Sequence, residues 1–324
     1  MKRRSSFVFP LKPVAASAIF LSGLAILLLI TSALFVPKNN LAEFGMEEIG
    51  ANGILGEQDH SIDVLIIGDS EAYSSISPME MWQAHGFTSY VCATSAQQLT
   101  TSFAFLKQAF RHQSPKVVVL ETNAIYRKVT MSQSLMSRLE SLFSVFRYHN
   151  RWKSFRFSEL LVTPQYTWTD DFKGYVYNTA VEAASPGEAM QPTDQVEAIP
   201  PLNREYVAAM AEFCRQHDTQ LLLVSTPSTL NWNMRRHNGI AALAQELGLT
   251  YYDLNLDNPA GIDWSSDTRD RGDHLNFSGA LKVSAWLGKT LSETFPLNRQ
   301  YDEAIVRRWN EALQRYLTVT GQQS

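Results

Sequence analysis

The chain has few cysteines and no excess of positive charge, and these two features argue against certain kinds of site and partner. It contains only two cysteines, Cys92 and Cys214, and their separation is not that of metal ligands. Both lie in apolar surroundings, which predicts two buried thiols acting as small hydrophobic side chains, with a disulfide as the alternative. The net charge of -4 argues against a nucleic-acid partner, because such proteins carry a concentrated basic surface.

One long apolar run is present near the start of the chain. Residues 13–37 are uncharged and exceed the roughly 20 apolar residues that a membrane-spanning helix needs. Lys2, Arg3, Arg4 and Lys12 precede this run, which favours a cytoplasmic N-terminus. We therefore expect a basic cytoplasmic tail over 1–12, a single signal-anchor span over 13–37, a connector over 38–60 and an extracytoplasmic domain over 61–324. A cleaved signal peptide is the alternative, although its apolar region is usually shorter.

Short apolar runs alternate with helical patterns through most of the remaining chain. The segments "SIDVLIIGDS", "FTSYVCATS", "PKVVVLETN" and "TQLLLVSTPS" are typical of buried strands. Apolar spacing predicts helices over 97–112, over "NREYVAAMAEFCRQHD" with Asn203 as its cap, and over "NGIAALAQELG" and "FSGALKVSAWLGKTLSETF". This alternation predicts a three-layer α/β/α domain with a mostly parallel sheet, whose strand ends share one rim.

The alternation breaks between residues 124 and 201. This segment is rich in aromatic residues, has several arginines and ends in a polar, proline-containing stretch; it is too long for a plain connector. We interpret it as a partly helical insertion over the active edge of the sheet, either packed for stability or contacting substrate. If it contacts substrate, Trp152, Arg151 and Trp168 are the residues we expect to bind it.

Ser70 stands where a buried strand ends, in "VLIIGDSEAYSSIS". Gly, Asp and Ser are ordinary turn residues, but open α/β folds also place their active sites at the carboxyl ends of strands. A serine there exposes its hydroxyl near backbone N–H groups, which can stabilise an oxyanion. It then needs a histidine as general base and an acid to orient that histidine.

Among the seven histidines, His274 has the context of such a base. It lies in the polar loop "DTRDRGDHLNFSG", close to Asp267, Asp270 and Asp273. In a parallel sheet of the expected kind, this loop emerges on the rim that bears Ser70. The alternative is an ordinary helix start with Asn276 or Ser278 as the cap.

The motifs "IIGDS" and "DRGDHLN" together resemble the SGNH (GDSL-type) hydrolase superfamily, and most closely its membrane-anchored DltD-like or alginate-acetylation-like branch. The resemblance covers about residues 61–291 except the insertion, and it implies a flavodoxin-like fold with Ser70 as nucleophile and His274 as base. The family's acid stands three residues before the histidine, where this chain has Arg271. We favour Asp270 as the acid, with Asp273 as the alternative.

The resemblance also implies the donors of an oxyanion hole. Asn123, in "ETNA", matches the side-chain donor of the family, and Thr94 and Ser95, in "CATSAQ", lie where the family has a glycine N–H. Glu71 follows the serine, and we expect it to be either solvated or paired with an arginine of the insertion.

These residues predict a serine esterase or O-acyltransferase. The expected anchor and the resemblance imply that it acts on acyl esters of a cell-envelope polysaccharide or related polymer. The resemblance implies a different alternative, a catalytically weak or inactive accessory partner of a membrane-bound O-acyltransferase. We expect no cofactor. A metal-dependent hydrolase built on Asp69, Asp270 and His274 is less favoured, because such ligand sets usually need more donors.

Overall fold

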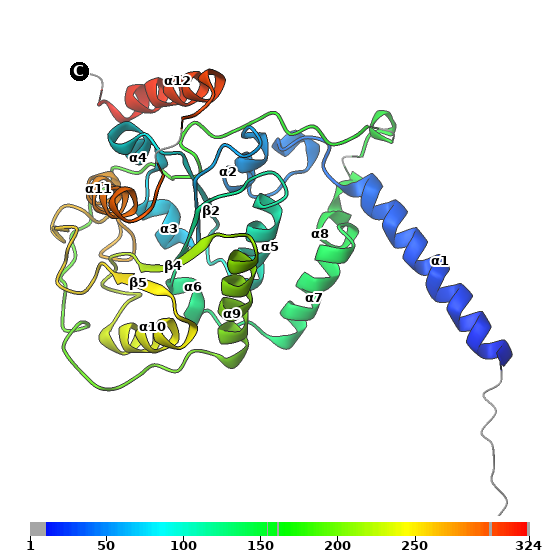
Figure 1. Cartoon of the computed structure of the whole chain (residues 1–324), viewed down its shortest axis with the longest axis horizontal. Coiled ribbons are helices and arrows are strands. Elements are labelled where there is room, and N and C mark those ends of the chain that lie inside the picture. The colour runs from blue at the N-terminus through cyan, green and yellow to red at the C-terminus, as the bar shows by residue number, and fades with distance from the viewer. Residues whose placement is uncertain (1–10, 154, 161, 298–299, 323–324) are drawn as a thin grey trace, which may run out of the picture.

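A parallel five-stranded sheet lies between two layers of helices (Figure 1). The computed structural model describes residues 11–153, 155–160, 162–297 and 300–322, so residues 1–10 of the expected basic tail lie outside the described residues. The strand order is β2-β1-β3-β4-β5, which is a doubly wound order that reverses between β1 and β3. This confirms the expected three-layer α/β fold. The strands are β1 (Val64–Gly68), β2 (Ser89–Ala93), β3 (Val117–Glu121), β4 (Gln220–Ser225) and β5 (Thr250–Asp253).

Alternate residues of each strand enter two separate cores, because successive side chains point to opposite faces of a sheet. Leu65 and Ile67 face the layer of α5 (Leu99–Ala109), α9 (Pro201–Gln216) and α10 (Met234–Leu247). Val64 and Ile66 face α3 (Ser70–Ser75), α4 (Pro78–His85) and α11 (Phe277–Thr294). Burial on both faces explains why the strands are continuous apolar runs. Two buried free thiols, at Cys92 and Cys214, confirm the expectation for the cysteines.

The caps of two helices illustrate what local sequence predicts. The side chain of Asn276 accepts a hydrogen bond from the Gly279 N–H at 3.2 Å and begins α11, which is one of the two caps expected there. The prediction for α9 was wrong, since α9 begins at Pro201 and Asn203 lies within it. The Asn203 amide instead donates to the carbonyls of Ile125 and Arg127, which ties α9 to the loop after β3.

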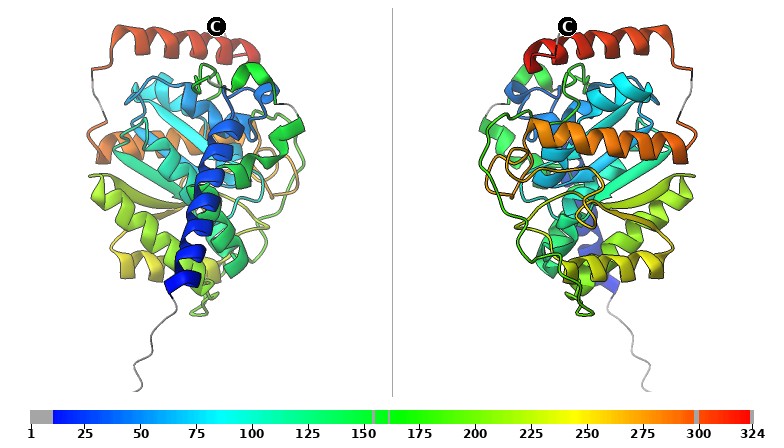
Figure 2. Two further views of the ribbon diagram at one scale, coloured as in Figure 1. Left: turned by 90° about the vertical axis from the view of Figure 1, so that its right-hand side faces the viewer. Right: turned by 90° about the vertical axis from the view of Figure 1, so that its left-hand side faces the viewer.

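Two structured segments were not expected from the sequence. Part of the region interpreted as a connector forms η1 (Ala42–Phe44), α2 (Ile49–Asn52) and η2 (Gly53–Gly56). The Tyr90 hydroxyl of β2 donates to the Gly50 carbonyl at 2.8 Å, so α2 covers the sheet. Near the chain end, α12 (Glu303–Thr320) crosses one end of the domain (Figure 2). It buries Trp309 against Trp82 and Tyr316 against Phe172.

The insertion divides into two parts with different places in the fold. Its first part forms α6 (Asn123–Tyr126), α7 (Met131–Leu142), α8 (Val145–Tyr148), η3 (His149–Lys153) and η4 (Phe157–Glu159). Here α7 packs on α5, whereas α8 and η3 pack on α1 (Leu11–Phe35). Its second part follows the edge of β2, where the Val91 N–H donates to the Lys173 carbonyl at 2.9 Å. It then crosses α3 and the His274 loop, through hydrogen bonds from Val176 to Tyr73 and from Glu182 to Thr268.

The apolar run near the start of the chain forms the single helix α1. Residues Pro13–Phe35 have a mean hydropathy of 2.5 and stand largely clear of the rest of the chain. By length and composition this helix fits a membrane anchor or a signal sequence. Figure 1 shows α1 projecting from the domain, with its C-terminal end beside α8.

Candidate active site at the carboxyl edge of the sheet

Ser70 is the first residue of α3 and directly follows β1 and Asp69. The Asp69 side chain caps α3 by accepting the Glu71 N–H at 3.0 Å. Glycine is required at position 68, directly before Asp69, because a Cβ there would lie 2.6 Å from the Glu121 Cβ of β3. Ser70 is 7% exposed, and in the part of the chain that the structure describes its hydroxyl makes no hydrogen bond. This strand-to-helix turn therefore presents the hydroxyl at the sheet edge.

Asp270 holds His274 by two hydrogen bonds. One carboxylate oxygen lies 2.7 Å from the His274 Nδ1 and the other accepts the His274 backbone N–H at 2.6 Å. Arg271 and Gly272 make this turn possible with φ values of 60° and 91°, and a Cβ on Gly272 would meet the Thr229 hydroxyl at 1.9 Å. The His274 Nε2 is enclosed and has no hydrogen-bond partner among the described residues. The imidazole is thus oriented at one nitrogen and available at the other.

Asp273 has a different main partner. Its Oδ2 lies 3.5 Å from the His274 Nδ1, beyond good hydrogen-bonding distance, whereas its Oδ1 accepts a hydrogen bond from the Asn231 amide. Of the two candidate acids, Asp270 is therefore the one whose geometry suits the orientation of His274.

Two contacts hold the His274 loop against the helix that begins with Ser70. The Asn231 amide, which binds Asp273, also donates to the Glu71 carboxyl at 2.7 Å. The Arg269 guanidinium donates to the Ser74 hydroxyl at 2.9 Å. Since Glu71 follows Ser70 and Asp273 precedes His274, the structure brings the two loops to the same edge of the sheet.

Asn123 lies at the same edge, where its amide contacts Asp69. The Asn123 Nδ2 donates to Asp69 at 3.0 Å, and the Arg127 Nε donates to the same carboxylate oxygen at 2.7 Å. One hydrogen of the Asn123 amide is therefore committed, and the second has no acceptor among the described residues, since a primary amide has two donors. Asp69 is 0% exposed, and Arg127 supplies the opposite charge that a buried carboxylate needs.

The other expected oxyanion donors follow β2. Thr94 is buried and its hydroxyl donates to the Gln97 side chain at 3.0 Å. Ser95 is exposed in the turn that follows. The Thr94 hydroxyl is thus bound to a side chain of its own loop. The predicted oxyanion donors in this turn would therefore be its backbone N–H groups.

The aromatic and basic residues expected to bind substrate lie elsewhere. Arg151 is 3% exposed, and its guanidinium donates to the carbonyls of Phe35 and Val36 and to Glu159. Trp168 is half-buried, and its backbone N–H and carbonyl bind the Asn40 side chain. Trp152 is 66% exposed in η3, beside Lys153. Arg151 therefore joins the insertion to α1, and the part of the insertion that lies near His274 is residues 176–184 instead.

Asp270, Asp273 and His274 are also the described residues that could share a metal ion, with their ligand atoms within 4.8 Å of one another. The sequence-based alternative included Asp69, which is not in this group. The Asp69 carboxylate is taken by Arg127, Asn123 and the Glu71 N–H. Within that group, Asp270 accepts the backbone N–H of His274 and pairs with its Nδ1.

Glu71 is neither solvated nor paired with an arginine of the insertion, which corrects the expectation for it. It is 1% exposed, and its Oε2 has no partner among the described residues. Burial, together with the nearby carboxyls of Glu121 and Asp69, raises the pKa of Glu71 well above its ordinary value. Burial and Asp69 likewise raise the pKa of Glu121. Two buried acids that resist ionisation therefore lie beside Ser70.

We expect Glu71→Gln to stabilise the chain at alkaline pH. A carboxyl whose pKa is higher in the folded than in the unfolded state does not destabilise the fold at a pH below its unfolded pKa of about 4.3. As the pH rises above that value, the carboxyl lowers the free energy of unfolding. Glutamine keeps the acceptor for Asn231 and cannot ionise. The free energy of unfolding of the detergent-solubilised chain, measured with urea, should rise by about 1 kcal/mol or more at pH 8 and change little near pH 4. Glu212→Gln, on the exposed face of α9, is the control. A larger gain at pH 4 than at pH 8 would contradict the assigned burial effect.

Sequence reasoning missed Asn231, Arg127 and Glu121. Glu121 ends β3, and Arg127 and Asn231 follow β3 and β4, so position after a strand was the available signal. Their roles depend on contacts with Asp69, Asp273 and Glu71, which belong to other loops and are not visible in local sequence.

Comparisons with known proteins give matches among solved structures only. No family model matches the chain, and no curated protein matches it. The chain is similar to a GDSL-like lipase from Bacteroides thetaiotaomicron, with 11% identity over 72% of this chain and 88% of that one and a TM-score of 0.38. It is also similar to a lipase/acylhydrolase from Enterococcus faecalis, with 11% identity over 74% of this chain and 100% of that one and a TM-score of 0.38. A psychrotrophic esterase from Pseudoalteromonas matches with 9% identity over 71% of this chain and 96% of that one and a TM-score of 0.37.

Proposed function

We propose that this chain is a membrane-anchored serine esterase or O-acyltransferase that uses Ser70, His274 and Asp270. The observation that carries the proposal is the pairing of His274 Nδ1 with Asp270 at 2.7 Å, while its Nε2 has no partner among the described residues. That imidazole stands in a loop tied by Asn231 and Arg269 to the helix that begins with Ser70. General-base activation of a serine needs one ring nitrogen held by an acid and the other free to accept the serine proton.

In the proposed mechanism the Ser70 Oγ attacks the carbonyl carbon of an acyl ester while His274 Nε2 takes the hydroxyl proton. Asp270 stabilises the resulting imidazolium. The Ser70 N–H, the free hydrogen of the Asn123 amide and the N–H groups of the Thr94–Ser95 turn receive the oxyanion. The imidazolium returns the proton to the leaving alcohol, and an acyl-serine remains. Water or a sugar hydroxyl then attacks it, which gives hydrolysis or transfer.

The proposed anchor is α1, retained in the mature chain. The Val145 N–H binds the Ser32 side chain at 3.2 Å, and the buried Arg151 binds the carbonyls of Phe35 and Val36. Removal of α1 would take these partners from a buried guanidinium, which is costly. The basic residues before the helix favour a cytoplasmic start, and this would leave the catalytic domain outside the membrane, among cell-envelope polymers. A membrane-bound O-acyltransferase is the partner we propose for a transfer reaction.

A fluorophosphonate probe that cannot cross membranes tests the proposal when it is added to spheroplasts producing the full chain. We expect the label on the peptide containing Ser70, in a membrane fraction that resists a carbonate wash. No labelling of a folded chain would contradict the enzyme and favour the accessory role. Label found only on a soluble, shortened chain would instead contradict the retained anchor.

A further inference from the structure

A cationic cavity lies where α1 meets the rest of the chain. It has a volume of about 470 Å³ and is lined by Ser32 and Val36 at the end of α1, and by residues of α5, α7 and α8. Ser32 is joined to α8 by hydrogen bonds with Ser144 and Val145. The position of this cavity relative to the apolar helix is therefore held by direct contacts.

Three cations line this cavity and form no ion pair with any described residue. Lys107, Arg111 and Arg147 have no carboxylate within 4 Å among the described residues, and Glu140 is the acidic residue in the same lining. Arg147 lies over the Phe105 and Tyr148 rings, with its guanidinium carbon 5.9 and 5.4 Å from their centroids. Burial, followed by the charge of Arg111, lowers the pKa of Lys107. A partly buried group of like charges of this kind favours an anion.

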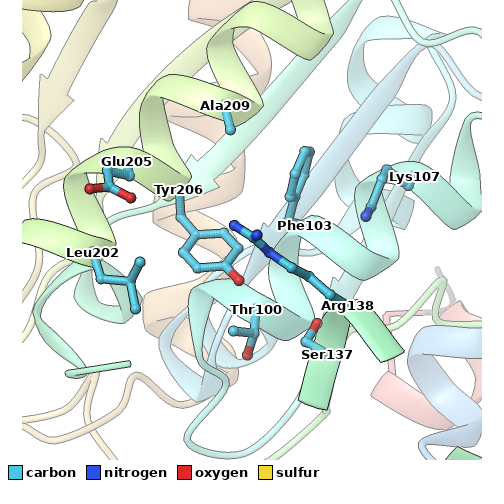
Figure 3. A pocket seen from close by; sticks show the side chains of 9 residues that line it. All are labelled: Thr100, Phe103, Lys107, Ser137, Arg138, Leu202, Glu205, Tyr206 and Ala209. Carbon is cyan, nitrogen blue, oxygen red and sulfur yellow. The ribbon is translucent and has the colours of Figure 1, made fainter. Parts of the chain in front are cut away.

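A second cavity of about 200 Å³ adjoins the first and shares Lys107 and Ser137 with it. Figure 3 shows that Lys107 and Arg138 reach toward it from different elements, around the rings of Phe103 and Tyr206. Arg138 also has no carboxylate within 4 Å among the described residues. Together the two cavities place cations next to apolar and aromatic walls.

The first cavity lies beside the end of α1 and beside a helix that exposes apolar side chains. If α1 spans the bilayer, Ser32 and Val36 lie near the level at which lipid phosphates occur. The helix α7, which leads into α8, exposes Met131 and Leu135 by 74% and 59%, and Leu142 by 68%. Leu135 and Leu142 follow Met131 by four and eleven residues, so the three side chains share one face of the helix. Exposed apolar residues beside unpaired cations are typical of a surface that lies on anionic lipid.

We propose that the cavity lined by Lys107, Arg111 and Arg147 binds the phosphate headgroup of an anionic membrane lipid. This proposal rests on the anchoring of α1 in the proposed function and is independent of the chemistry at Ser70. The single negative charge of such a headgroup, together with Glu140, would offset part of the charge of the three cations, and the bound lipid would fix the domain relative to the bilayer. We choose a lipid as the ligand because the cavity lies beside the end of α1, the proposed membrane anchor.

The test uses the full chain in a micelle of an uncharged detergent, with dioctanoyl phosphatidylglycerol as the probe and binding measured by calorimetry. We expect saturable binding, and we expect each of Lys107→Gln, Arg111→Gln and Arg147→Gln to weaken it by about fivefold, since a basic residue at an anionic surface is worth roughly 1 kcal/mol. The matched control removes three cations from other faces, as Arg215→Gln, Lys289→Gln and Arg307→Gln together, and should bind like the parent chain.

Two further probes distinguish the sources of the phosphate. Inorganic phosphate at the same concentration should bind much more weakly than the lipid, and dioctanoyl phosphatidylcholine should bind between the two. Equal binding of phosphatidylglycerol to the parent chain and to a chain that carries Lys107→Gln, Arg111→Gln and Arg147→Gln together would overturn the proposal. Equal binding of inorganic phosphate would also overturn it, in favour of a free anion. Fluorophosphonate labelling of Ser70 in the same preparations separates this outcome from a failure of the proposed enzyme.

Discussion

Ser70→Ala should lower the hydrolysis of 4-nitrophenyl acetate by the full chain at least about 10³-fold and abolish labelling by a fluorophosphonate. Loss of a nucleophile leaves only the oxyanion donors and substrate binding, which retain a small part of the acceleration. The substitution removes one oxygen that makes no hydrogen bond within the described residues. Stability should therefore change by less than about 1 kcal/mol, and lost activity would not reflect unfolding.

Ser75→Ala is the matched control for this experiment. Ser75 ends the same helix, is 0% exposed and has a hydroxyl without a partner among the described residues. Its replacement removes a similar atom from a similar environment and should leave both labelling and hydrolysis unchanged. If both Ser70→Ala and Ser75→Ala hydrolyse the ester at the parent rate, Ser70 is not the nucleophile and the proposed mechanism is wrong.

Replacement of the two acids beside His274 should have very unequal effects. Asp270→Asn should lower kcat by about 10³ to 10⁴, because a carboxamide can donate to the Nδ1 and hold the wrong tautomer. This is the magnitude known for the corresponding change in the serine-protease triad. Asp273→Asn should cost less than about tenfold, since Asp273 lies 3.5 Å from the Nδ1 and mainly binds Asn231. Steady-state rates with KM determined separately are the measurement.

The comparison of these two variants also tests the hydrogen-bonding network. Asp270 holds both the ring and the backbone N–H of His274, so its replacement should reduce kcat more than it raises KM. Equal losses in both variants would mean that the two carboxyls act together. A larger loss for Asp273→Asn would assign the acid to Asp273 and leave Asp270 as a turn residue.

Much of the fold was predictable because its determinants are local. The strands are apolar on both faces, which gives continuous hydrophobic runs, and α11 carries its own cap in Asn276. By contrast, α12 is amphipathic in sequence but packs on Trp82 and Phe172, so its place depends on distant residues. Asn203 has the residue type of a cap, yet its amide binds the loop after β3. Local propensity cannot predict such a tertiary contact.

The candidate site shows the same division. Ser70 and His274 could be predicted as candidates because each combines a reactive residue type with a position after a strand or before a helix. The burial of Glu71 and the role of Arg151 at the end of α1 could not be found, because both depend on which segments meet. An arginine among aromatic residues has the same local sequence whether it binds a ligand or a helix end.

The sequence by itself determined an alternating α/β chain, an apolar helix at its start and the order of a serine and a histidine along it, since periodicity, hydropathy and residue type are local properties. Only the tertiary structure shows that Asp270, at 2.7 Å, lies closer to the His274 Nδ1 than Asp273, at 3.5 Å. The turn through Arg271 and Gly272 folds Asp270 back onto His274, and Asn231 draws Asp273 toward Glu71. Neither choice is encoded in spacing, because both arise where loops from different strands meet at one edge of the sheet.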